Sequence, residues 1–120
     1  MRLYHLSYDT INCERDFGTY ANARRYLLCV LGSSTVRSMS SYTESSIILE
    51  FEVAEPTRFF NFLRNNLSQY FYYSISLVAQ NQRNRHDFIS HNPNMQLNLA
   101  LQRELKALNC NNLGIQIIPY

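Results

Sequence analysis

The order in which hydrophobic periods follow one another along the first 78 residues is the feature that most constrains this fold. Residues 1–9 alternate with period two, which predicts a strand that ends at Asp9. Helical spacing then runs over 17–31 and stops at Gly32, a residue type that favours the position after a helix C-terminus. Residues 35–40 and 46–53 flank a short polar turn, and this pattern is typical of a β-hairpin.

A second helix and a fourth strand complete the series. Pro56 is suited to the first position of a helix, whose apolar stripe is expected to contain Phe59, Phe60, Leu63 and Leu67. Period two returns over 70–78. The order strand, helix, strand, strand, helix, strand predicts an α+β fold of the ferredoxin-like βαββαβ type, with two helices on one face of an antiparallel sheet. A different α+β sheet built from the same elements is the alternative.

The length of the chain predicts one domain over residues 1–120. Within it, 1–79 form the expected ferredoxin-like core, and 80–92 form a polar loop rich in Asn and Gln. Residues 93–120 are expected to add a C-terminal helix and a short edge strand.

Capping residues and hydrophobic periodicity predict where the C-terminal helix and the edge strand begin and end. Asn92 is the expected cap of the helix, which begins at Pro93 and runs to about Asn109 with a stripe of leucines. Residues 113–118 alternate again before Pro119, which predicts an edge strand that pairs with the sheet of this chain or with that of a partner.

Composition adds a weak hint about partners and a prediction about location. The net charge of +2 is small, but Lys106 is the sole Lys among eleven basic residues, and Arg favours bidentate contacts to phosphate and carboxylate. Codon or lineage bias explains the same skew. Cys13, Cys29 and Cys110 form no metal or redox motif and are expected to be reduced thiols. With no leader and no apolar run long enough to span a membrane, the sequence predicts a soluble cytoplasmic protein.

Asp9 is the leading candidate for a functional residue. An acidic side chain at the end of a strand lies at the rim of a sheet, where ligands and metals are often bound. The same residue type is also favoured in turns and as the N-cap of a helix.

The Leu6-Ser-Tyr-Asp9 end of the first strand, followed by a helix and a hairpin, resembles two families. They are the small CRISPR-associated endonuclease-like subunit of the spacer-integration complex and the toxin ribonucleases of the VapD type. The resemblance covers residues 2–78 and implies a ferredoxin-like homodimer in which two acids face each other across a two-fold axis. Asp9 is the residue that corresponds to this acid. The C-terminal helix has no counterpart in these families.

A nuclease hypothesis argued from the residues themselves requires metal ligands in addition to Asp9. Phosphodiester hydrolysis can use Mg²⁺ held by carboxylates, with Asp9 as catalytic residue and metal ligand and with Asp16 or Glu14 adding an oxygen. A route without a metal needs a general base such as His5 or His86. We expect His5, inside the first strand, to be structural.

Basic residues suggest where nucleic acid would be contacted. Arg83, Arg85 and His86 lie close together in the polar loop and are the predicted phosphate-binding residues, although a solvated charged loop explains them equally well. Arg24 and Arg25 are expected to be solvated charges on the exposed side of the first helix.

Tyrosines on the predicted sheet invite an RNA-stacking hypothesis. Glu50 and Glu52 on the expected open face argue against it because they would repel phosphates. A dimer interface or the core between sheet and helices explains the tyrosines better.

The sequence thus predicts a Mg²⁺-dependent endonuclease or a nucleic-acid-binding subunit of a prokaryotic or viral defence-related system. The alternative is a non-catalytic protein-binding module, such as a small inhibitor or adaptor, on the same scaffold.

Overall fold

The computed structural model describes residues 2–51, 55–78 and 93–120. In chain order its elements are β1 (Arg2–Thr10), α1 (Cys13–Asp16), α2 (Tyr20–Gly32), β2 (Ser38–Thr43), β3 (Ser46–Phe51), α3 (Pro56–Leu67), β4 (Phe71–Val78) and α4 (Met95–Lys106). The predicted α+β class is confirmed.

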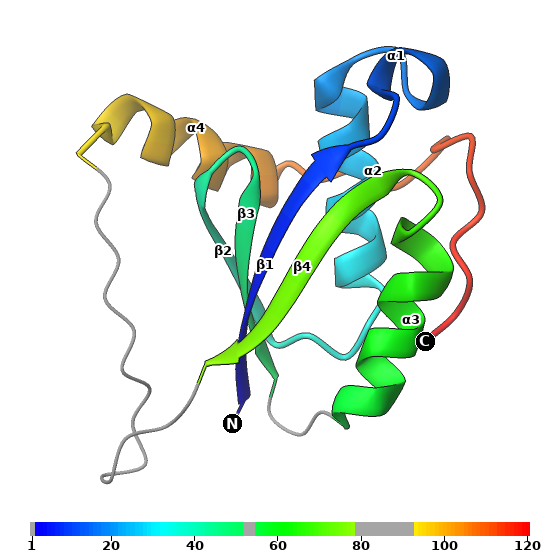
Figure 1. Cartoon of the computed structure of the whole chain (residues 1–120). Coiled ribbons are helices and arrows are strands. Elements are labelled where there is room, and N and C mark those ends of the chain that lie inside the picture. Colours follow the sequence, from blue (N-terminus) through cyan, green and yellow to red (C-terminus); the bar gives the residue numbers. More distant parts are fainter. Residues whose placement is uncertain (1, 52–54, 79–92) are drawn as a thin grey trace, which may run out of the picture.

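One four-stranded sheet organises these elements, with the strand order β2-β3-β1-β4. β1 pairs antiparallel with β3 on one side and with β4 on the other, and β2 pairs antiparallel with β3. α2 and α3 lie on one face of this sheet, and α4 lies beside the β2–β3 hairpin (Figure 1).

The core lies between the sheet and the helices α2 and α3. Alternation along β1 buries Tyr4, Leu6 and Tyr8, and the same helix side of the sheet receives Ile47, Leu49 and Phe51 from β3. α3 begins at Pro56 as predicted, but Phe62 rather than Phe60 belongs to its buried stripe; Phe60 is 38% exposed.

Several expected element boundaries are wrong for local reasons. Phe17 lies outside the first long helix because a short helix, α1, ends before it and Gly18 follows with a positive φ of 80°. α2 starts after Thr19, whose side chain accepts a hydrogen bond from the Asn22 amide at 3.2 Å. β2 continues to Thr43, beyond its predicted end.

The C-terminal third departs most from the prediction. α4 is capped by Asn94, whose side chain accepts from the Leu97 amide at 3.0 Å, and it ends at Lys106. Residues 113–118 are not a strand; they run as an irregular segment past α2 to α3 (Figure 1). The predicted polar loop 80–92 lies outside the described residues, as does Glu52.

None of the helices in the described ranges combines the length and the apolar composition needed to cross a bilayer.

Candidate functional site

Asp9 lies near the C-terminal end of β1, opposite Tyr72 of β4, and is exposed. Its Oδ1 accepts a hydrogen bond from the Thr10 amide at 2.9 Å. The cap of the following helix is Asn12, whose side chain accepts from the Arg15 amide at 3.1 Å. Asp9 is therefore neither buried nor a helix cap, and its carboxylate faces solvent at the rim of the sheet.

Asp16, an expected further ligand, forms an ion pair with its neighbour Arg15. Asp16 is bound by the guanidinium of Arg15, with Nε at 2.9 Å from Oδ1 and Nη2 at 3.2 Å from Oδ2. Within residues 2–51, 55–78 and 93–120, no three His, Cys, Asp or Glu side chains come together in a way that could hold a metal ion. Because Mg²⁺ is often held by only one or two carboxylates together with water, a magnesium ion at Asp9 stays a prediction.

The predicted phosphate-binding residues Arg83, Arg85 and His86 lie outside the described residues, as does the candidate base His86. The prediction that Arg24 is a solvated charge is wrong. Arg24 is 3% exposed, and Arg25 donates to backbone carbonyls of the C-terminal segment. Arg24 is therefore buried, whereas Arg25 is half-buried and forms its hydrogen bonds at the surface.

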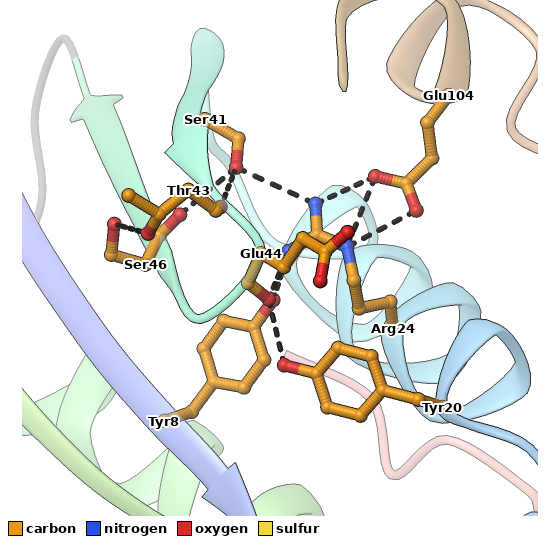
Figure 2. Close-up of polar contacts among 8 residues, drawn as sticks. All are labelled: Tyr8, Tyr20, Arg24, Ser41, Thr43, Glu44, Ser46 and Glu104. Atoms are coloured by element: carbon orange, nitrogen blue, oxygen red, sulfur yellow. Dashed lines mark hydrogen bonds and ion pairs between the residues drawn. The ribbon is translucent and has the colours of Figure 1, made fainter. Parts of the chain in front are cut away.

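Arg24 forms the centre of the main polar cluster in the described part of the chain (Figure 2). Its Nε lies 3.1 Å from each carboxylate oxygen of Glu104 on α4, and its Nη2 lies 2.6 Å from Oε1. Nη1 donates to the Tyr8 hydroxyl and, at 2.5 Å, to the Glu44 carbonyl. Nη2 also donates to the Ser41 hydroxyl at 3.4 Å. The cluster therefore joins α2, α4, β1 and the β2–β3 turn.

Every N–H of this guanidinium has an acceptor. Arginine carries five N–H groups, and Glu104, Tyr8, Glu44 and Ser41 accept from all of them. A depression of about 270 Å³ lies between α2 and α4 and includes Arg24 and Glu104 in its wall. Because the guanidinium has no free donor, this depression does not present a cation ready for a phosphate. The cluster therefore has a structural role: it attaches α4 to α2 through Arg24 and Glu104.

Burial of the tyrosines near this cluster changes their acidity. Burial raises the pKa of Tyr8, against the opposing effect of the Arg24 charge. Burial also raises the pKa of Tyr20, whose hydroxyl donates to the Glu44 carbonyl at 2.8 Å. In the neighbouring core, burial raises the pKa of Tyr26 to about 12, and its hydroxyl donates to the Asn66 carbonyl at 2.8 Å.

These shifts predict a loss of stability at alkaline pH. In the unfolded chain Tyr26 ionises near its ordinary pKa of 10.0, whereas in the folded chain it keeps its proton up to about pH 12. Between these values the folded state binds more protons, so the free energy of unfolding falls as pH rises. Ultraviolet titration should show tyrosines that ionise later than the exposed ones, and Tyr26→Phe should reduce the decline. A stability that is flat from pH 10 to 12 would contradict this assignment.

The C-terminal segment is fixed to the helices by contacts that sequence reasoning missed. Cys29 of α2 and Cys110 form a disulfide, so the prediction of three reduced thiols is wrong, and Cys13 is the free cysteine. Arg25 donates to the carbonyls of Asn109 and Asn111, each at 2.9 Å. These contacts hold the residues after α4 against α2.

Asn66 fixes the last residues in a similar way. This side chain of α3 is 2% exposed, donates to the Ile118 carbonyl at 3.0 Å and accepts from the Ile118 amide at 2.7 Å. Its position within the buried stripe of α3, beside Leu63 and Leu67, was a usable signal, because a polar residue at such a position needs a buried partner.

The face of the sheet opposite α2 and α3 is covered by no described helix, and we call it the helix-free face. The pairing of the strands places serine side chains at nearly half of its positions. Its residues are Leu3, His5, Ser7, Asp9, Ser38, Ser40, Ser46, Ile48, Glu50, Tyr72, Ser74, Ser76 and Val78. Tyr72 is 66% exposed among these serines, and the acids Asp9 and Glu50 stand at opposite ends of the face.

The fold and the cluster define a class only: an α+β protein with an open, four-stranded antiparallel sheet, closed on one side by helices and a cross-linked C-terminal segment. No family model, curated protein or solved structure matches the chain. The resemblance to the CRISPR-associated and VapD-type families stays a prediction.

Proposed function

We propose that this chain is a non-catalytic protein-binding module that receives its partner on the helix-free face. The observation that carries the proposal is the exposure of Tyr72, at 66%, on a sheet surface on which serine is the commonest residue. Tyrosine supplies a large and rigid contact area, and serine supplies adaptable hydrogen bonds, so surfaces of this composition suit protein recognition.

We propose further that the scaffold is ferredoxin-like. Two features support this: the succession β1, α2, β2, β3, α3, β4 and the placement of β1 between β3 and β4 in an antiparallel sheet. In this arrangement the helices bury one face of the sheet and leave the other available. The short α1 and the C-terminal α4 are additions to that scaffold.

Charge favours a protein over a nucleic acid as the partner. Asp9 and Glu50 on the helix-free face would repel phosphates, and the guanidinium groups of Arg24 and Arg25 make internal hydrogen bonds. A protein surface with hydroxyl or amide groups at its centre and a cation near Asp9 would be complementary.

An arginine introduced at Ser7 tests the proposal. Ser7 lies on the central strand β1 between Ser46 and Ser74, so Ser7→Arg places bulk and charge in the middle of the helix-free face. We expect capture of a protein partner to fall by tenfold or more, the loss typical of about 2 kcal/mol at an interface centre. Quantitative pull-down with the wild-type chain and the variant measures this loss.

Thr57→Arg is the matched control, because Thr57 is exposed on α3, on the other side of the sheet. It adds the same side chain and should leave capture unchanged. Equal capture by the wild type and Ser7→Arg would exclude the helix-free face as the binding surface.

The nuclease hypothesis is a second candidate, and the solvent-facing carboxylate of Asp9 is the observation that favours it. The same purified proteins serve to separate the two. Cleavage of RNA or DNA in added Mg²⁺ that is lost in Asp9→Asn would favour the nuclease and count against a purely non-catalytic module.

A further inference from the structure

β4 is an edge strand, and its outer side is unpaired in the described part of the chain. It pairs with β1 without interruption, from Leu3 opposite Val78 to Thr10 opposite Phe71. Its eight residues, Phe-Tyr-Tyr-Ser-Ile-Ser-Leu-Val, include no charge and no proline. Edge strands of monomeric proteins usually carry a charged residue, a proline or a bulge, because an unprotected edge pairs with other chains.

The opposite edge of the same sheet is protected, which makes the contrast informative. β2 has six residues, and its pairing with β3 is irregular between Ser40 and Thr43. α4 packs beside it, with Leu101 buried and Glu104 bound to Arg24 (Figure 1). Among the described residues, one edge is thus covered by an added helix, and the longer and more apolar edge is left unpaired.

We propose that a second copy of this chain pairs antiparallel with β4, so that two sheets join into one of eight strands. Leu77 on this strand is 53% exposed, and Tyr73 on the same face is half-buried. With the two-fold axis at Ile75, Tyr73 of each copy lies opposite Leu77 of the other. Tyr72 lies opposite Val78 on the helix-free face. Pairs of aromatic and aliphatic residues of this kind stabilise antiparallel strands.

This register is the reason for proposing a second copy, rather than another protein, as the chain that pairs with β4. The strand is complementary to itself, since no charged residue meets a like charge and each exposed apolar side chain meets an apolar partner. An axis at Ser74 would instead place Leu77 opposite Phe71, which is 2% exposed in its own core and offers less surface. Both copies would keep their helices on one side of the joined sheet.

The arrangement has a consequence for Asp9. The two β1 strands would be separated by both copies of β4, that is by three strand spacings or about 14 Å. The two Asp9 carboxylates would therefore not meet, in contrast to the family resemblance, which implies facing acids. The inference does not rest on the proposed function, because it requires no other protein.

Oligomeric state and one charged substitution test the pairing. Light scattering after size exclusion should give the wild type a mass twice the 14.1 kDa of one chain, with dissociation on dilution. Leu77→Lys should be monomeric, because it places a charge beside Tyr73 of the partner copy. Leu99→Lys is the matched control, since Leu99 is 49% exposed on α4 away from this edge, and it should remain dimeric.

A monomeric wild type at all concentrations, or a dimer that persists in Leu77→Lys, would overturn the proposal. Cysteine cross-linking in a Cys13→Ser background fixes the register. Ile75→Cys should form an intermolecular cross-link under mild oxidation, because residue 75 faces itself across the axis. Cross-linking of Ser74→Cys in its place would overturn the axis at Ile75. Neither result depends on Ser7, so failure here is distinguishable from failure of the proposed partner-binding face.

Discussion

Arg24→Met is expected to lower the free energy of unfolding by about 3 kcal/mol, at the lower end of the range for breaking a buried ion pair. The guanidinium is 3% exposed and supplies the ion pair to Glu104 as well as hydrogen bonds to Tyr8, Ser41 and the turn carbonyl of Glu44. Methionine keeps much of the apolar stem but none of these donors. The lower end of the range applies because Glu104 is 32% exposed and can be rehydrated.

Urea unfolding measures this loss, and thermal unfolding should show a midpoint lower by roughly 10 °C. Hydrogen exchange gives a more specific result. Amides of α4 should lose protection more than those of α3, because Arg24 connects α4 to the rest of the fold through Glu104. Arg103→Met, on the exposed side of α4, is the matched control and should change stability by less than about 0.5 kcal/mol. Equal effects of the two substitutions would show that the cluster does not fasten α4.

The parts of the fold that were predictable are those that local periodicity determines. Alternation over residues 1–9 predicted the first strand, and Pro56 identified the start of α3. These signals arise within a few residues of one another. They do not report which elements meet, so the packing of α4 beside the β2–β3 hairpin was outside their reach.

Arg24 shows most clearly that local patterns do not identify contacts between residues distant in the sequence. It was expected to be a solvated charge because arginine is rarely buried without a partner, although it shares the helical spacing of Leu27 and Leu28. The partner, Glu104, is 80 residues away in the sequence, and no local sequence pattern around Arg24 identifies it. The disulfide between Cys29 and Cys110 was missed for the same reason, since their spacing forms no recognisable motif.

The erroneous C-terminal strand has a different cause. Leu113, Ile115 and Ile117 are half-buried and alternate with exposed residues, so the period of two was real. The backbone there is satisfied in part by the side chain of Asn66, which bonds both the amide and the carbonyl of Ile118. Alternation therefore reports a segment with one side on an apolar surface, and a strand requires in addition a neighbouring strand with free backbone groups.

Cys110→Ser is expected to produce the largest destabilisation of the substitutions considered, about 4 kcal/mol. The disulfide joins Cys29 and Cys110 across 81 residues, and a cross-link that closes a loop of this length restricts the unfolded chain strongly. Because Cys110 is exposed, serine at this position loses little packing, so the effect reports the cross-link itself. Unfolding in urea should shift in the same direction when the wild type is treated with a reductant.

Cys13→Ser separates the cross-link from a general effect of losing a thiol. Cys13 is free and half-buried, so its replacement should cost little and leave the dependence on reductant unchanged. Thiol titration of the denatured wild type without reductant should find Cys13 alone. Three reactive thiols would contradict the cross-link. Stability in Cys110→Ser equal to that of the wild type would show that Arg25, Asn66 and the apolar contacts of 113–120 suffice to hold the C-terminal segment against the helices.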